Sequence, residues 1–323
     1  MKQFLLKHLP DDNKKRKKIA IIVTITIAGL FTVLGIFGIG TYGMALFIIT
    51  PLFIGVCPVL LFGIKKELSK KEALNLGFLT LGLFGAFLIV FAIEGLICLV
   101  MAAPIALLLT WLGILMAISM LNKQPNGAPL SIIILIVAMP SIAWLEKGGK
   151  PAINSVVTSI EIDAPAEIIW KNVVHFPTLK EPEEFLFKTG IAYPIGATIE
   201  GQGVGAIRYC NFNTGSFVEP ITVWNQPKLL QFNVEEQPAP MKELSFWDIN
   251  APHLHDYFVS KRGQFKLISL ANGKTRLEGT TWYYHKIAPA FYWKFWSDFI
   301  VHAIHWRVLN HIKNISELET PIQ

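Results

Sequence analysis

The first half of the chain is a series of long apolar runs separated by short polar or charged segments. Two runs, 19–40 and 43–64, each hold about twenty uncharged and mostly apolar residues, enough to cross a hydrocarbon layer of about 30 Å as a helix. A longer run, 73–121, is interrupted by EGLICLVMAAP. Its polar residue, glycine and proline predict two helices joined at a break. The last run, 130–144, is shorter and contains a proline, yet it ends on a tryptophan suited to a membrane interface. We predict a fifth span there.

The second half has the pattern of an α+β domain. VVTSIEI alternates as a half-buried strand does, and Asp163 as N-cap with Pro165 in the first turn predicts a helix in AEIIWKNVV. Further strand-like runs, most of them separated by turn signals, are 206–212, 216–224, 229–235, 254–260, 264–270 and 275–285. The segment 289–317 repeats apolar residues at helical spacing, among them Phe291, Phe295 and Phe299. This order predicts an antiparallel curved sheet around a long C-terminal helix.

Charge divides the chain in the same way. The net charge is +6, and because residues from Lys147 onward hold 17 basic and 17 acidic side chains, all of it belongs to the first half. Its basic residues flank the apolar runs, mainly in 1–18 and 65–71, which predicts that these segments are cytoplasmic. With five spans the second half is extracytoplasmic, and with four it stays cytoplasmic. A neutral domain lacks the basic stripe that nucleic-acid binding needs, so no nucleic-acid partner is expected.

The predicted organisation has three parts. Residues 1–18 form a basic cytoplasmic tail, 19–146 a transmembrane region with about five helices, and 151–323 a globular domain. The first apolar run is too long for a cleaved signal peptide and is interpreted as an anchor. Glu94, the one carboxylate within the apolar block, is expected at the interface in contact with water rather than in an ion relay.

Several phrases of the second half resemble a known superfamily. They are SIEIDAPAEIIWKNVVHF, GVGAIRYCNFNTGSFVEPITVWNQPKLLQFNV and GKTRLEGTTWYY, the last followed by a long helix. Over about 155–317 the chain is similar to the SRPBCC superfamily, the START-like or helix-grip fold of polyketide cyclases, birch-pollen-type allergens and lipid-transfer domains. The resemblance implies a deep, mostly apolar cavity between the sheet and the last helix. It identifies a scaffold rather than a chemistry, and the apolar N-terminal half departs from most members.

Arg208 and Glu219 are the most informative pair of polar residues. If Asn213-Thr214 is a two-residue hairpin loop, the two side chains lie directly opposite each other, and if Gly215 adds a bulge they lie diagonally. Glu219 shares its face with apolar residues, so an ion pair facing the apolar side is expected. It would fix the strand register, and the alternatives are orientation of a polar ligand group or catalysis.

Other candidates for the cavity are aromatic or imidazole side chains. We expect His255, Tyr283, Trp306 and His302 to be able to contact a ligand. His302 and His305 share a helix face and could bind zinc with His253 or His255, but a recognised zinc-ligand motif is absent, and neither metal nor cofactor is expected. The glycines of GQGVG precede a strand, so a bend is predicted instead of a nucleotide loop. Cys210 is expected to be an inert packed thiol.

Three functions are compatible with these patterns. The first is a membrane-anchored module that binds a lipid or other hydrophobic small molecule. The second is a cyclase-like or dehydratase-like enzyme in which His255, Tyr283, Glu219 or Arg208 transfers protons. The third is a membrane sensory or assembly protein. In each, the rings of TTWYYHKIAPAFYWKFW are expected in the core and the cavity lining, with Trp293 or Trp296 able to touch the bilayer.

Overall fold

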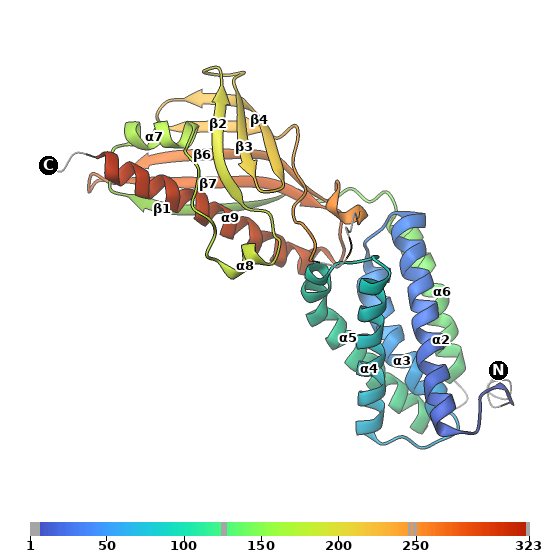
Figure 1. Cartoon of the computed structure of the whole chain (residues 1–323). Helices are drawn as coiled ribbons and strands as arrows, with labels where there is room; N and C mark the ends of the chain where they lie inside the picture. Colours follow the sequence, from blue (N-terminus) through green and yellow to red (C-terminus); the bar gives the residue numbers. More distant parts are fainter. Residues whose placement is uncertain (1–6, 124–127, 245–246, 248–250, 321–323) are drawn as a thin grey trace. The chain divides into compact units, whose positions relative to one another are not determined.

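The chain forms two compact units, seen in a computed structural model that describes residues 7–123, 128–244, 247 and 251–320 (Figure 1). The first unit comprises Met1–Gly149 with two later segments, Glu243–Pro252 and Ile287–Pro289. The second comprises Lys150–Lys242, His253–Lys286 and Ala290–Gln323. The chain therefore leaves the first unit and returns to it twice.

The first unit is helical. Its elements are α2 (Asn13–Val33), the π-helix η1 (Leu34–Ile39), the π-helix η2 (Ala45–Ile49), α3 (Thr50–Gly63), α4 (Lys70–Val90), α5 (Leu96–Lys123) and α6 (Ala128–Glu146). In the described part of the chain, four helical stretches are long and apolar enough to cross a membrane: Asn13–Ile39, Ala45–Gly63, Lys70–Val90 and Leu96–Asn122. The apolar part of α6, Leu130–Glu146, is shorter.

Helices α3 and α5 approach each other closely at two glycines. A Cβ on Gly55 would lie 2.3 Å from the carbonyl oxygen of Thr110, and one on Gly113 would lie 2.5 Å from that of Leu52. The Thr110 hydroxyl also donates a hydrogen bond to the Pro51 carbonyl across the contact, at 3.1 Å. Small residues that let two backbones touch, with a hydroxyl bond between them, are typical of helix packing in membranes.

The break between α4 and α5 differs from the expectation in two ways. It lies at 91–95, and Pro104 is inside α5 instead of starting a helix. Glu94 is buried rather than in contact with water. The reason is the returning segment: the Leu96 amide donates to the Leu244 carbonyl at 3.3 Å, and the Cys98 thiol donates to the Glu243 carboxylate at 2.7 Å. Local sequence patterns do not predict a contact between residues so far apart in the chain.

The second unit is a seven-stranded antiparallel sheet in the order β1-β7-β6-β5-β4-β3-β2. The strands are β1 (Asn154–Ile162), β2 (Pro194–Glu200), β3 (Ile207–Phe212), β4 (Gly215–Asn225), β5 (Leu229–Asn233), β6 (Phe258–Ser269) and β7 (Thr275–His285). The helical elements are α7 (Ala166–Val174), α8 (Phe185–Lys188), η3 (Pro252–Leu254) and α9 (Ala290–Glu319). Figure 1 shows the sheet curving around the long helix α9. The predicted helix-grip fold is confirmed.

Some local predictions for this unit are wrong. The N-cap of α7 is Pro165, without a side-chain bond, and not Asp163. Strand β2 was not predicted. The end of the run 254–260 and most of the run 264–270 belong to one strand, β6, because the expected turn is a register shift after Ser260. By contrast, the GQGVG glycines, all at positive φ, form the predicted bend between β2 and β3.

The aromatic residues of α9 lie on two different faces. Phe291, Phe295 and Phe299 are exposed, at 76%, 66% and 49%, instead of facing the sheet as expected. The buried face holds Trp293, Val301, Val308, Leu309 and Ile312. The physical reason is the helical repeat: Phe291, Phe295 and Phe299 follow one i+4 row, and the residues that meet the sheet follow another. Trp293 is thus a core residue, not one exposed to a bilayer.

Candidate ligand cavity

A cavity of about 120 Å³ lies between the sheet and α9, within the second unit. Strands β3 to β7 and the middle of α9 supply its walls. Its aromatic lining consists of Phe212, Phe217, Phe232, Phe258 and Phe265. A cavity of roughly 150 Å³ holds a benzene ring in another protein, whereas sites for drug-sized ligands span roughly 300–1,000 Å³. A space of this volume therefore suits a single ring or a short chain.

Arg208 and Glu219 stand in the cavity wall as a buried ion pair. The β3–β4 hairpin pairs Phe212 with Gly215, so the loop has two residues and Arg208 lies directly opposite Glu219, the first of the two pairings considered. Arg208 Nη1 donates to Glu219 Oε2, and the side chains are only 1% and 7% exposed. Two adjacent strands thus fix both partners, which explains how the pair can form away from water.

The guanidinium of Arg208 is surrounded mainly by aromatic rings. Its Cζ lies 5.7 Å from the ring centre of Phe176, 5.4 Å from that of Phe232 and 5.6 Å from that of Phe265. Guanidinium groups over aromatic faces gain electrostatic stabilisation. Its Nε is buried and, among the described residues, donates no hydrogen bond. One donor of a charged group is therefore still available next to the cavity.

Burial dominates the electrostatics of the wall. It raises the pKa of the Glu219 carboxyl, and Arg208 opposes this shift by favouring the ionised form. We regard the pair as ionised, because an arginine keeps its charge in proteins and a neutral Glu219 would leave that charge unpaired. Burial also raises the pKa of the Cys210 thiol to about 12, so it is inert as a nucleophile, as expected.

His305 is the cavity residue that the sequence did not single out as a ligand contact. Its Nδ1 lies 3.0 Å from the Thr158 hydroxyl and its Nε2 lies 2.8 Å from the Thr281 hydroxyl. Burial, with a smaller effect of His302, lowers the pKa of His305 to about 4, so the ring is neutral at neutral pH. The sequence contained a pattern that could have predicted this position: His305 lies on the same side of the helix as Val301, Val308 and Ile312, which are all buried.

Of the six residues predicted to contact a ligand, Arg208 and Glu219 line the cavity. Tyr283 is fully buried beside it, where its hydroxyl donates to Asp298 at 2.5 Å. His302 binds the Thr158 hydroxyl at 2.7 Å through Nδ1. None of the four candidates besides Arg208 and Glu219 lines the cavity. Trp306 is 44% exposed on α9, and His255 is exposed after η3.

Comparison with known proteins gives distant structural likenesses. No protein-family model matches the sequence, and no curated protein sequence matches it either. Truncated norcoclaurine synthase from Thalictrum flavum is 16% identical, with 54% of this chain and 98% of that chain covered and a TM-score of 0.35. The Zhui aromatase/cyclase from Streptomyces sp. R1128 is 11% identical, with 51% and 94% covered and a TM-score of 0.34.

A third similar structure is an uncharacterised protein from Bacillus thuringiensis. It is 14% identical, with 51% of this chain and 100% of that chain covered and a TM-score of 0.34. All three are covered almost completely, whereas about half of this chain is matched. At such identities and scores no activity can be transferred. The helix-grip assignment rests on the order, pairing and curvature of this chain's own elements.

Proposed function

We propose that this protein is a membrane-anchored member of the SRPBCC superfamily whose C-terminal domain binds a small hydrophobic molecule. The observation that carries the proposal is the aromatic cavity with a buried Arg208 Nε that donates no hydrogen bond to any described residue. A ligand oxygen there would satisfy this donor, and unpaired buried donors are costly. The fitting ligand is one ring or a short chain carrying an oxygen.

The charge balance of the wall favours a neutral ligand. Glu219 already compensates the charge of Arg208, so a second carboxylate would be repelled by the first in a poorly solvated site. A carbonyl or hydroxyl oxygen can accept the Nε hydrogen bond without that repulsion. Lipid-derived ketones, alcohols and similar amphipathic molecules belong to this class, and a membrane anchor would keep the domain close to them.

This ligand class can be tested with single-ring probes on the full chain in lipid nanodiscs. In fluorine NMR titrations, 4-fluoroacetophenone should bind more tightly than 4-fluoroethylbenzene, which lacks the oxygen, and than 4-fluorobenzoate, which adds a charge. Gly279→Val should weaken the binding, because Gly279 lines the cavity and a Cβ there meets its nearest atom at 3.7 Å.

Gly196→Ala is the control, since Gly196 lies in β2 outside the cavity lining and a Cβ there would have ordinary contacts at 3.6 Å. It should leave the titration unchanged. If none of the probes binds, or if Gly279→Val binds them as the unmodified chain does, the binding function is wrong.

An enzyme of cyclase or dehydratase type is the second candidate, favoured by a neutral imidazole, His305, in the same wall as a carboxylate. A general base needs a free nitrogen facing its substrate. Both ring nitrogens of His305 are held by threonine hydroxyls, and Glu219 is held by Arg208. These contacts favour binding over proton transfer.

We further propose that α6 is a fifth span and that the C-terminal domain is extracytoplasmic. Helix α6 has 19 residues, or about 28 Å of rise, close to the thickness of a bilayer core of about 30 Å. Its last residue, Glu146, accepts hydrogen bonds from the Met44 amide at 2.8 and 3.0 Å, at the loop between η1 and η2. Two basic residues contact Asp11 in another part of the unit: Arg16 donates a hydrogen bond to its backbone carbonyl, and Lys65 donates one to its carboxylate.

The topology predicts opposite results for two reporter fusions. A reporter active only in the cytoplasm should be inactive when fused after Gln323 and active when fused after Lys123, which follows four spans. An active reporter after Gln323, with protein of full length in the membrane, would contradict the fifth span.

A further inference from the structure

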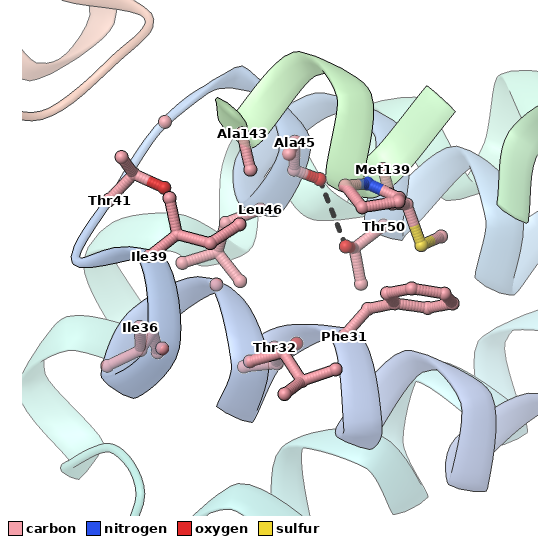
Figure 2. Close-up of a pocket in the computed structure, with 15 residues that line it drawn as sticks. Phe31, Thr32, Ile36, Ile39, Thr41, Ala45, Leu46, Thr50, Met139 and Ala143 are labelled. Carbon is pink, nitrogen blue, oxygen red and sulfur yellow. Dashed lines mark hydrogen bonds between the residues drawn. The ribbon is translucent and has the colours of Figure 1, made fainter. Parts of the chain in front are cut away.

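A second cavity, of about 220 Å³, lies inside the helical unit (Figure 2). It is lined by the end of α2 with η1, by η2 with the start of α3, and by α6. Its wall is made mostly of aliphatic side chains and glycines, with Phe31 and Met139 among the larger groups. The volume exceeds the roughly 150 Å³ that holds a benzene ring. It is independent of the cavity in the C-terminal domain.

The backbone around this cavity departs from regular α-helix on all sides. Two π-helical stretches, η1 and η2, follow each other and are joined by a turn in which Gly40 has a φ of 78°. On the third side, Pro140 lies inside α6 and contributes no backbone N–H. Single π-turns in helices occur frequently at functional sites, because they widen the helix and re-aim its side chains. These irregularities lie in the elements that line the space.

One polar group in the wall lacks a partner. The hydroxyl of Thr32 is buried, with the residue 2% exposed, and forms no hydrogen bond within the described part of the chain. Other hydroxyls of the same unit bond back to their own helix: Thr24 donates to the Ala20 carbonyl at 2.7 Å and Thr80 to the Leu76 carbonyl at 2.8 Å. Figure 2 shows Thr32 on the α2 side of the cavity, opposite the η2 side.

Water is a poor occupant for such a space. A buried water needs two to four polar partners, and cavities with apolar walls stay dry. An apolar ligand with one oxygen fits both properties of the wall, because its carbon atoms fill the space and its oxygen pairs with Thr32. Leu34, Gly38 and Pro140, all in the lining, are exposed on the surface of the unit, so a ligand can reach the cavity from the side, through the region that a bilayer would cover.

We propose that this cavity binds the chain or ring of a membrane lipid that carries an oxygen group beside Thr32. The shared chemistry is an apolar chain with an ester, hydroxyl or carbonyl oxygen. Two sources supply it: the acyl chain of a glycerolipid and the chain of an isoprenoid alcohol. With about 220 Å³, the cavity encloses part of such a molecule, and the remainder lies in the bilayer.

The test uses the full chain in lipid nanodiscs and two photoreactive probes. One is a phosphatidylcholine with a diazirine in one acyl chain, and the other is a diazirine-bearing farnesol. After irradiation, mass spectrometry measures the adducts on peptides containing residues 31–50 and 139–143. We expect at least one probe to label these peptides above the level of lipid-facing peptides of α4, and the probe that does so identifies the source.

Cavity-filling variants separate a site from general contact with lipid. A Cβ on Gly35 meets nothing within 4 Å, so Gly35→Leu should fill the space and reduce labelling to the level of the α4 peptides. Gly82→Leu is the matched control, since Gly82 also has nothing within 4 Å and lies in α4, outside the cavity. If Gly35→Leu does not fold, Gly38→Leu at the rim replaces it, because its Cβ has its nearest neighbour at 4.0 Å.

Thr32→Val tests the role of the oxygen, because it keeps the shape and removes the hydroxyl. A lost neutral hydrogen bond should lower the occupancy of the labelling probe about two- to tenfold, measured by titration. The site is overturned if neither probe labels the cavity peptides above the α4 level, or if Gly35→Leu and Gly82→Leu give equal adduct yields. Unchanged occupancy in Thr32→Val would overturn the assignment of the oxygen to that residue.

Discussion

Replacing Arg208 with leucine is expected to destabilise the C-terminal domain by about 3–5 kcal/mol, because it leaves the carboxylate of Glu219 buried without its counter-charge. Amide hydrogen exchange on the full chain, read on peptides of β3 and β4, would measure this. If the amides exchange through global opening, their rates should rise roughly 150- to 5,000-fold. The variant retains an apolar side chain of substantial volume, so the loss of packing alone is a smaller effect.

The double variant Arg208→Leu/Glu219→Leu is the control. Replacing both partners of a buried ion pair by apolar side chains is often neutral or stabilising, so most of the protection should return. Equal exchange rates in the single and double variants would show that the lost charge pairing is not the cause.

The loss of stability in the single variant Arg208→Leu should depend on pH. Burial raises the pKa of Glu219 above its ordinary value of 4.5, and removal of Arg208 takes away the group that opposes the shift. A carboxyl whose pKa is raised on folding favours the folded state below its unfolded pKa, and this gain is lost as the pH rises through the folded pKa. The single variant should therefore lie closer to the wild type at pH 4 than at pH 7.

The second large effect is expected at the contact between α3 and α5. Gly55→Ala places a methyl group 2.3 Å from a backbone oxygen of α5, which a helix backbone cannot relieve without moving away. Overpacking in a close contact typically costs about 1–3 kcal/mol, and separation of the helices also weakens the bond from Thr110 to Pro51. The expected result is a clear fall in the thermal unfolding temperature of the helical unit in detergent.

Gly82→Ala provides a matched comparison, because the same substitution is made in a helix where the added Cβ meets nothing within 4 Å. Alanine has the higher helix propensity of the two residues, so this variant should be as stable as the wild type or more stable. A fall of similar size in both variants would mean that glycine matters at Gly55 for a reason other than close packing.

Features fixed by local sequence were predictable. The Arg208–Glu219 register followed from a two-residue turn, which determines the pairing of every residue in a hairpin. Helix α7 was predicted from the start signal at Asp163 and Pro165, although its N-cap is Pro165, and the long α9 from apolar residues at helical spacing. Strand β6 was divided in error because Gly263 looked like a turn residue. Its role depends on a neighbouring strand: a Cβ there would lie 2.5 Å from the ring of Phe232, a contact that no local pattern contains.

The candidate site was predictable to the extent that it lies in the hairpin. Trp306 was chosen for its aromatic character, yet it follows His305 by one residue, and a step of about 100° on a helix turns it to solvent. Arg208 Nε and the Thr32 hydroxyl lack hydrogen-bond partners among the described residues. The sequence could not predict this, because it depends on which groups surround these atoms in the folded chain. Likewise, nothing in the first 149 residues indicates that Glu243 and Leu244 complete their fold.

The first unit depends on segments that come late in the chain, and this affects the order in which it can fold during synthesis. During synthesis the last helix of the first unit, α6, ends at Glu146, but two segments of the same unit, Glu243–Pro252 and Ile287–Pro289, have not yet been translated. The Ala288 amide, which donates to the Tyr42 carbonyl at 2.9 Å, becomes available after almost nine-tenths of the chain. A ribosome that stops after the helices would release an unfinished unit, and a protease that cuts between Gly149 and Lys150 would leave both products holding parts of it.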